Sequence, residues 1–124
     1  VSENNLEKEI EFLGFLENPK DLLMSADIFL LPSLWEGFGY VLAEASLSCL
    51  PVIAFDISSN AELIDKSTGF LTEPQKVKPF SDKIEYLYLN PKERIAIGKA
   101  GQAFVRKNFD SKFIFQCIED YLLS

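Results

Sequence analysis

The sequence predicts an α/β fold, a partial Rossmann-like domain with a parallel sheet that is followed by C-terminal helices. Short apolar runs alternate with helical stretches over residues 1–73, and this order is typical of βαβ units. Residues 74–124 contain helical patterns only. Apolar residues make up 48% of the 124 positions, which is enough to bury a core within one domain or part of one.

Four apolar runs are predicted as strands. The first covers residues 9–15, which hold four large apolar side chains. Residues 27–31 form a nearly continuous apolar run closed by a proline, a pattern that favours a strand buried on both faces. Residues 52–55 predict a second buried strand, and residues 69–72 predict a last short one.

The helices are predicted from capping residues and apolar spacing. Residues 19–26 form a short helix, because Asn18 can cap it and Pro19 suits its first position. A helical stretch over residues 40–50 is ended by a proline. Residues 59–62, Ser-Asn-Ala-Glu, have the form of a capping box that opens a short helix. Three further helices are predicted over residues 80–89, 91–108 and 110–123.

Charge and residue types exclude several classes of function. Nineteen acidic and 12 basic residues give a net charge of −7, which argues against a nucleic-acid binder and against adsorption to an anionic membrane. The chain contains no histidine, so Ser-His-Asp catalysis, Cys-His catalysis and His-ligated zinc are excluded within it. Cys49 and Cys117 each lie in an apolar helical run, and we expect buried thiols in a reducing, cytoplasmic setting.

The sequence carries no targeting or membrane-spanning signal. No apolar run reaches about 18 residues, so no membrane span is predicted. Residues 1–5 are acidic and polar, which is unlike a signal peptide. The first residue is not Met, and we expect a fragment or a processed product.

The turn at residues 32–39 is the strongest candidate for a ligand site. It follows the strand predicted at 27–31, and ligands of open parallel sheets bind beyond the carboxyl ends of the strands. Two glycines in the turn carry no side chain that would block a ligand. The first N–H groups of the next helix have no partner within it and lie at the positive end of its dipole. A phosphate could therefore bind the N–H groups of Phe38, Gly39, Tyr40 and Val41.

Two carboxylates flank this helix start. Glu36 lies in the turn, and Glu44 lies eight positions later among apolar neighbours. A carboxylate in such surroundings needs hydrogen-bond donors, and a ribose diol supplies two at a matching spacing. Glu44 is therefore a candidate ribose ligand, and Glu36 would face the group that the diphosphate carries. The alternatives stay open: Glu44 as a solvated residue on the outer face, Glu36 as a partner of the helix dipole, and the glycines as a structural turn.

The ordered series of motifs resembles the donor-site segment of family 4 glycosyltransferases of the GT-B fold. The series runs Ala-Asp-Ile-Phe-Leu-Leu-Pro-Ser at residues 26–33, Glu-Gly-Phe-Gly at 36–39, Glu-Ala at 44–45 and Pro-Val-Ile-Ala at 51–54. Glu36 and Glu44 match the Glu-x7-Glu motif of that family. Residues 62–64 and 68–71 continue the pattern, and the resemblance covers about residues 9–110.

The resemblance implies that residues 1–124 are a partial C-terminal, nucleotide-sugar-binding domain, with a βαβ part at 1–73 and a helical part at 74–124. It implies a hexosyltransferase-like enzyme of carbohydrate or polysaccharide biosynthesis that transfers a sugar to an unknown acceptor with retention at the anomeric carbon. Glu36, the catalytic candidate, would contact the donor sugar, and Glu44 would hold the ribose hydroxyls. No metal and no cofactor are expected, because the nucleotide-sugar is a substrate. The other donor-binding residues would be Gly37, Phe38, Gly39, Tyr40 and Val41, the last four through backbone amides that meet sugar and phosphate.

The chain also departs from the family pattern. Cys49 and the pair Ser58-Ser59 stand where the family usually has glycine, at positions that favour a tight backbone turn. The family's phosphate-clamping Arg and Lys, its acceptor-binding N-terminal domain and two strands of its sheet have no counterpart in these 124 residues, so the isolated chain is expected to be inactive. We expect residues 9–15 to pair beside residues 27–31, or a homodimer through exposed sheet edges. A parent enzyme peripheral to a membrane fits the same resemblance.

Two other functions stay open. One is a GT-B-related sugar-nucleotide epimerase, and the other is a non-catalytic, degenerate fragment that acts as an assembly module. Trp35 is interpreted as a structural aromatic or as a stacking surface for a sugar or base, and Glu62 as a cap of its own helix. Lys66 is a candidate anion contact, and the basic residues from Lys92 to Lys107 are interpreted as a dispersed solvated face.

Overall fold

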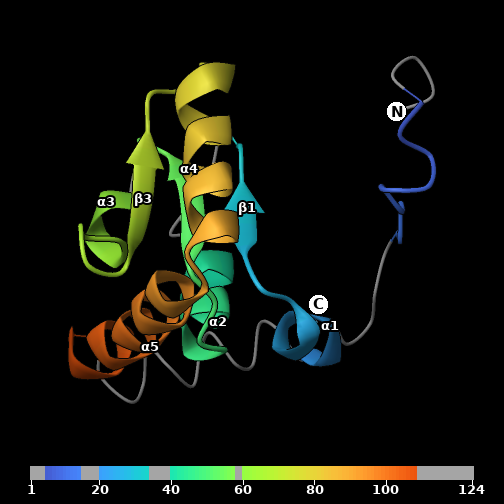
Figure 1. The fold of residues 1–124 in the computed structure, drawn as a ribbon. Coiled ribbons are helices and arrows are strands. Elements are labelled where there is room, and N and C mark those ends of the chain that lie inside the picture. Colours follow the sequence, from blue (N-terminus) through green and yellow to red (C-terminus); the bar gives the residue numbers. More distant parts are fainter. Residues whose placement is uncertain (1–4, 15–19, 34–39, 58–59, 109–124) are drawn as a thin grey trace.

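The computed structural model describes residues 5–14, 20–33, 40–57 and 60–108 of the 124-residue chain. Within these ranges the architecture is α/β, with a parallel sheet and helices on both of its faces (Figure 1), so the predicted fold class is confirmed. The helices are α1 (Lys20–Ser25), α2 (Tyr40–Leu47), α3 (Asn60–Leu63), α4 (Val77–Leu89) and α5 (Pro91–Asn108). The strands are β1 (Phe29–Leu31), β2 (Val52–Phe55) and β3 (Gly69–Thr72).

The sheet has the order β1-β2-β3, and each neighbouring pair runs parallel. Phe29 of β1 lies opposite Val52 of β2, which lies opposite Gly69 of β3. Helix α2 connects β1 to β2, and α3 connects β2 to β3, so the described part of the sheet is built from two βαβ units. All four residues of the central strand β2 are buried, as the sequence predicts for residues 52–55.

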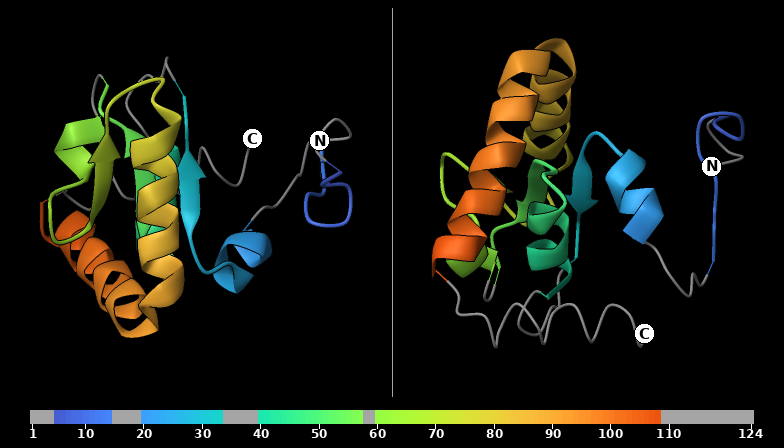
Figure 2. Two further views of the ribbon diagram at one scale, coloured as in Figure 1. Left: turned by 45° about the horizontal axis from the view of Figure 1, so that its top comes forward. Right: turned by 90° about the horizontal axis from the view of Figure 1, so that it is seen from below.

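Alternate residues of β2 face two separate cores, because successive side chains of a strand point to opposite faces. Val52 and Ala54 pack in a core that includes α2 residues and Val105 of α5. Ile53 packs on the other face with Leu87 of α4 and Ile97 of α5. Helix α5 therefore contributes to both cores, and Figure 2 shows it beside both α4 and α2.

Strand β1 is shorter and more exposed than predicted. It covers residues 29–31 instead of 27–31, and Leu30 is 42% exposed, so the prediction of a strand buried on both faces is wrong. Leu30 lies opposite Ile53 and therefore shares the face that α4 covers. Helix α4 packs over β2 and β3, however, which leaves the β1 part of that face open.

Residues 9–14 do not form the predicted strand; Phe15 lies outside the described residues. This segment contains one turn residue and then backbone without assigned secondary structure or ladder pairing, and Figure 1 shows it apart from the sheet. The expectation that it pairs beside β1 is wrong, because among the described residues β1 pairs with β2 alone. A strand needs a hydrogen-bonding neighbour, and local apolar character does not supply one. A homodimer through the sheet edge stays a prediction.

The helices follow the predicted order with shifted ends. Helix α2 ends at Leu47 instead of residue 50, and Cys49 has the left-handed backbone conformation, with φ of +63°. Cys49 is exposed, so the prediction of a buried thiol in a helix is wrong at this position; Cys117 lies outside the described residues. Helix α4 begins three residues earlier than predicted, α5 has the predicted bounds, and residues 110–123 lie outside the described ranges.

Candidate functional site

The carboxyl ends of β1, β2 and β3 lie at one edge of the sheet, toward which the arrows of β1 and β3 point in Figure 1. Helices α2 and α3 follow β1 and β2, so both helices begin on the side of this edge and run back along the sheet. The N–H groups of the first turn of α2, which have no partner within the helix, therefore lie near the strand ends. We call this region the carboxyl edge.

The predicted site residues divide between described and undescribed parts of the chain. Glu36, Gly37, Phe38 and Gly39 lie outside the described residues, as does Trp35. Tyr40 is the first residue of α2, and Val41 follows it with a half-buried side chain. Glu44 lies in the second turn of α2 and is half-buried.

Apolar packing fixes the position of Glu44. Its neighbours Leu42, Ala43 and Ala45 are completely buried in the core on the α2 face of the sheet. Four positions separate Glu44 from Tyr40, so the two residues lie on the same side of α2, about 6 Å apart along its axis. A ligand at the start of α2 would thus lie about one helical turn from the Glu44 backbone.

The end of α2 is closed by a Schellman motif. The N–H of Leu50 donates to the carbonyl of Ala45, and the N–H of Cys49 donates to the carbonyl of Ser46, at 3.1 and 3.0 Å. The left-handed residue between these bonds is Cys49, where such motifs usually have glycine. The expectation that this position favours a tight turn is confirmed at Cys49, while Ser58 and Ser59 lie outside the described residues.

Helix α5 holds α2 from the side. The Nε2 atom of Gln102 donates to the carbonyl of Leu47 at 2.8 Å. Gly98 lies against the carbonyl of Cys49 so closely that a Cβ atom there would be 2.1 Å from its oxygen. These contacts fix the C-terminal end of α2, and through the helix they fix Glu44 and the first turn.

Asn60 is a buried residue of the carboxyl edge that the sequence interpretation did not single out. Its side chain is 0% exposed, and its Nδ2 donates to the carbonyl of Phe55, the last residue of β2, at 2.9 Å. The N–H of Asp56 donates to the carbonyl of Thr72 and joins the ends of β2 and β3. Asn60 Oδ1 and Thr72 Oγ1 are both buried, and neither atom forms a hydrogen bond within the described part of the chain. The available signal was an asparagine at the start of the helix that follows a predicted buried strand.

The other residues weighed in the sequence lie away from this edge or are not described. Lys66 lies in the turn before β3, at the opposite edge of the sheet from the start of α2, and the interpretation of it as an anion contact stays a prediction. In the same turn, hydrogen bonds from Ser67 lower the pKa of Asp65 below its ordinary value. Nothing is described of the Glu62 side chain.

The described residues were also compared with the requirements of a metal site and of a membrane-spanning helix. Among them, no three acidic or cysteine side chains come together as a metal site. No described helix has both the length and the apolar character needed to cross a membrane.

Comparison with known proteins gives one family. The family model "Glycosyl transferases group 1" matches residues 1–104. The capsular polysaccharide biosynthesis glycosyltransferase CapM of Staphylococcus aureus is 28% identical over 130 aligned positions, which cover 95% of this chain and 34% of CapM. The structure of S. aureus TarM in complex with fondaparinux, α-GlcNAc-glycerol and UDP has a TM-score of 0.85 at 25% identity, covering 99% of this chain and 25% of TarM. The structure of Anabaena HepE in complex with UDP has a TM-score of 0.85 at 29% identity, covering 98% of this chain and 34% of HepE. The chain thus spans about a third or less of these relatives.

Proposed function

The chain belongs to the group 1 glycosyl transferase family, and on this premise we propose that it is the nucleotide-sugar-binding part of a retaining glycosyltransferase. The GT-B fold and the family are those that the sequence resemblance implies. The division into a βαβ part at 1–73 and a helical part at 74–124, the transfer to an acceptor, and a cytoplasmic setting belong to the proposal. So does the expectation that the chain alone is inactive, because it spans about a third or less of its relatives.

One observation carries the proposal: the half-buried Glu44 lies one turn inside α2, and α2 begins at the carboxyl edge of a parallel sheet. TarM and HepE, which share this fold, have structures in complex with UDP. The proposal places a nucleoside diphosphate at the start of α2, with its phosphates against backbone N–H groups. The donor-binding residues are Glu36, Gly37, Phe38, Gly39, Tyr40, Val41 and Glu44.

Glu44 suits a ribose for a chemical reason. An ionised carboxylate has two acceptor oxygens and no donor, so it pairs with two neighbouring hydroxyl groups. Hydrogen bonds to a charged acceptor are stronger than neutral ones, and partial burial of Glu44 reduces the competition from water. The nucleoside would therefore lie beside the second turn of α2, with the diphosphate toward the first turn.

The positive end of α2 also suits the reaction. Negative charge grows on the departing diphosphate as the bond to the anomeric carbon breaks, and fixed N–H dipoles stabilise such charge without having to reorganise. Because these dipoles come from the backbone, the proposal requires neither a metal nor a cofactor. Glu36, four positions before Tyr40 in the sequence, is the proposed catalytic contact to the donor sugar.

The test is the affinity of the purified parent protein for UDP, compared with GDP and ADP, by titration calorimetry. Glu44→Gln removes the charge but keeps the shape, and we expect the affinity for the preferred nucleotide to fall about tenfold to a hundredfold. The matched control is Glu73→Gln, which removes an exposed carboxylate directly after β3, at the same edge of the sheet. Equal affinities of the two variants would remove Glu44 from the site. Saturable binding of none of the three nucleotides would favour the assembly module, and products formed from the donor alone would favour an epimerase.

A further inference from the structure

The described part of the domain contains a cavity away from the carboxyl edge. Its volume is about 520 Å³, and it lies between α4, α5 and the turn before β3. Because β3 runs parallel to β1 and β2, the residues that precede it lie at the opposite edge of the sheet from the proposed nucleotide site. Small-molecule sites typically have volumes of about 300–1,000 Å³. This cavity is therefore large enough for a ligand of its own.

Helical spacing explains two walls of the cavity. Lys83 and Tyr86 are three positions apart in α4, so both side chains lie on one side of that helix. Glu93, Ala96 and Ala100 follow one another at intervals of three and four positions in α5 and share one side in the same way. The third wall is the turn before β3, together with the start of that strand. Three segments that are separate in the sequence thus meet at one cavity.

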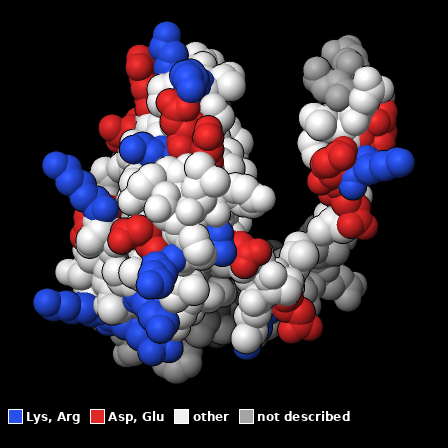
Figure 3. All heavy atoms as spheres, viewed as in Figure 1, with Lys and Arg blue, Asp and Glu red and all other residues white. Residues whose placement is uncertain are grey.

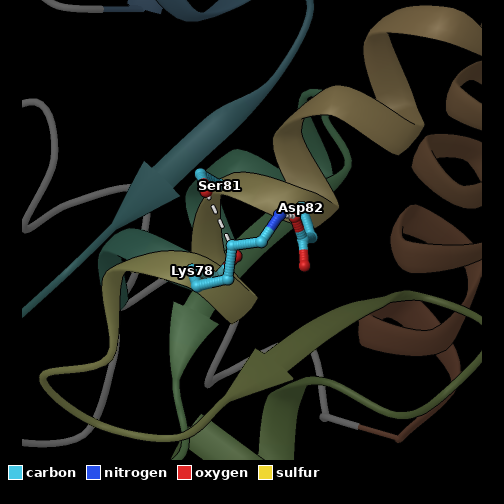
Figure 4. A network of polar contacts seen from close by, with 3 residues as sticks. All are labelled: Lys78, Ser81 and Asp82. Carbon is cyan, nitrogen blue, oxygen red and sulfur yellow. Dashed lines mark hydrogen bonds and ion pairs between the residues drawn. The ribbon is translucent and has the colours of Figure 1, made fainter.

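Two lysines bring positive charge to the cavity. Lys83 is half-buried, and its Nζ lies 4.8 Å from the centre of the Phe70 ring, which is also part of the wall. Lys66 is exposed in the turn before β3. Within the described part of the chain, α4 has an ion pair between Lys78 and Asp82 at 2.6 Å (Figure 4), and neither cavity lysine has such a partner. An anionic ligand would supply the counter-charge for these two lysines.

The charge of the helical part differs from that of the whole chain. Residues 74–124, which include α4 and α5, hold nine basic and six acidic residues, which gives +3, whereas the chain as a whole carries −7. In Figure 3 basic side chains gather over α5 at the lower left. Attraction between charges in solution falls off within a Debye length, about 10 Å, so the charge close to the cavity matters most. The acidic composition of the chain therefore does not argue against an anionic ligand here.

The cavity also offers hydrogen-bond acceptors for hydroxyl groups. The carboxylate of Glu93 accepts hydrogen bonds and donates none when it is ionised. The Oγ of Ser67 donates its proton to Asp65 Oδ1 at 2.7 Å, so it meets any further partner as an acceptor. A simple inorganic anion would gain little from these two groups and would be repelled by the carboxylate. A ligand with hydroxyl groups would donate to both.

Aromatic and small apolar side chains form the rest of the wall. The rings of Phe70 and Tyr86 pack edge to face, with their centres 6.0 Å apart, and Tyr86 is 41% exposed. Ala96 and Ala100 have short side chains and leave room beside these rings. A sugar ring has apolar C–H groups between its hydroxyl groups, and burying them against such a wall is favourable. Cations, acceptors and an apolar wall in one cavity are complementary to a sugar ring with an anionic substituent.

We propose that this cavity binds an acidic sugar, that is, a sugar ring with a carboxylate or phosphate group. The anionic group lies against Lys66 and Lys83, and hydroxyl groups donate to Glu93 and Ser67. The C–H groups of the ring lie against Tyr86. A free monosaccharide and one unit of an acidic polysaccharide share this chemistry, and probes of different length separate the two sources. The proposal does not rest on the nucleotide site, which lies at the other edge of the sheet.

The test is titration calorimetry of the purified parent protein with glucuronate and glucose 6-phosphate, and with glucose as the neutral probe. We expect saturable binding of both acidic sugars and about tenfold weaker binding of glucose, because glucose lacks the charge-assisted contacts. Lys66→Gln combined with Lys83→Gln should lower the affinity for glucuronate about tenfold for the same reason. The charge-matched control is Lys8→Gln combined with Lys76→Gln, since both lysines are exposed and lie outside the cavity wall. We expect wild-type affinity for the control and the same thermal unfolding for both double variants.

The same titrations can overturn the proposal. Absence of saturable binding of both acidic sugars, equal affinities for glucuronate and glucose, or equal losses in the two double variants would each do so. Inorganic phosphate that binds as tightly as glucose 6-phosphate would identify a simple anion site instead. A loss of glucuronate binding in Glu44→Gln would place the sugar in the proposed nucleotide site. Tighter binding of a hyaluronan tetrasaccharide than of glucuronate, lost in the variant of the cavity lysines, would support a polysaccharide unit as the ligand, and equal affinities would support a free monosaccharide.

Discussion

The contact between α5 and the end of α2 can be tested with the substitution Gly98→Ala, which replaces one Cα hydrogen with a methyl group. In Gly98→Ala the new Cβ would lie 2.1 Å from the carbonyl oxygen of Cys49 and 2.9 Å from its carbon, where ordinary contact begins at 3.4 Å. Both partners are backbone atoms, which cannot rotate away as a side chain can. Helix α5 would therefore have to retreat from α2 by about 1 Å, and the hydrogen bond from Gln102 to Leu47 would lengthen with it.

The expected loss of folding stability follows from three contributions to the free energy of unfolding. Overpacking of this kind costs about 1–3 kcal/mol, and the rigid backbone contact favours the upper end. Weakening the Gln102 hydrogen bond costs about 1 kcal/mol, whereas alanine gains about 1 kcal/mol of helix propensity over glycine. The free energy of unfolding should therefore fall by about 2–3 kcal/mol. For 124 residues, that corresponds to a decrease in Tm of about 8–12 °C.

Urea and thermal unfolding, followed by circular dichroism, measure this loss. Gly101→Ala is the matched control on the same helix, because its Cβ would meet the carbonyl oxygen of Thr68 at 3.4 Å and Ser46 Oγ at 3.6 Å, which are ordinary contacts. We expect the free energy of unfolding of the control to lie within about 1 kcal/mol of that of the wild type. If Gly98→Ala is as stable as Gly101→Ala, the helix contact does not hold α2 in place.

Two further predictions concern single positions. Cys49→Gly should raise the free energy of unfolding by about 1 kcal/mol in urea titrations, because glycine adopts the left-handed conformation of this residue without steric cost; a lower stability would contradict the Schellman assignment. The lowered pKa of Asp65 means that its folded-state hydrogen bonds contribute stability above the ordinary value of 3.8, and that this contribution is lost as the pH falls through the lower folded-state pKa. The difference in Tm between the wild type and Asp65→Asn should therefore be constant near neutral pH and shrink at acidic pH; a difference that does not change with pH would refute this.

The elements predicted correctly depend on local patterns. Strand β2 has a continuous apolar run that is buried between two neighbouring strands. Strand β3 has a short run with an apolar centre, and α5 has a proline start and a regular apolar spacing. The predicted strand at residues 9–15 has a similar apolar pattern, but its formation depends on a partner strand elsewhere in the sheet. Local sequence cannot supply that information, because pairing in a parallel sheet joins segments that are distant in the chain.

In the candidate site, too, features that depend on local sequence were predicted, and features that depend on contacts between distant segments were not. The order of strand, glycine turn and helix predicts where a ligand would meet the sheet, and the structure places Tyr40, Val41 and Glu44 on a helix that begins there. The sequence did not reveal that Asn60 supports the end of β2, because its contact with the Phe55 carbonyl joins two elements across a turn. It also placed Cys49 in a helix, because the end of α2 is fixed by contacts with α5, about 50 positions later in the chain.

The net charge of the whole chain does not show how the charged side chains are distributed over its surface. A net charge of −7 predicts repulsion from an anionic surface only if the charges are mixed over the molecule. Here most of the acidic residues precede position 74, and three cations of α5, Lys92, Lys99 and Arg106, share one face, so the net charge does not describe the surface of α5. The nucleotide site relies on backbone dipoles and would depend little on Lys92 or Lys99. Lys92→Gln combined with Lys99→Gln should therefore leave the affinity for the nucleotide unchanged in the same calorimetric titration, whereas Glu44→Gln should lower it.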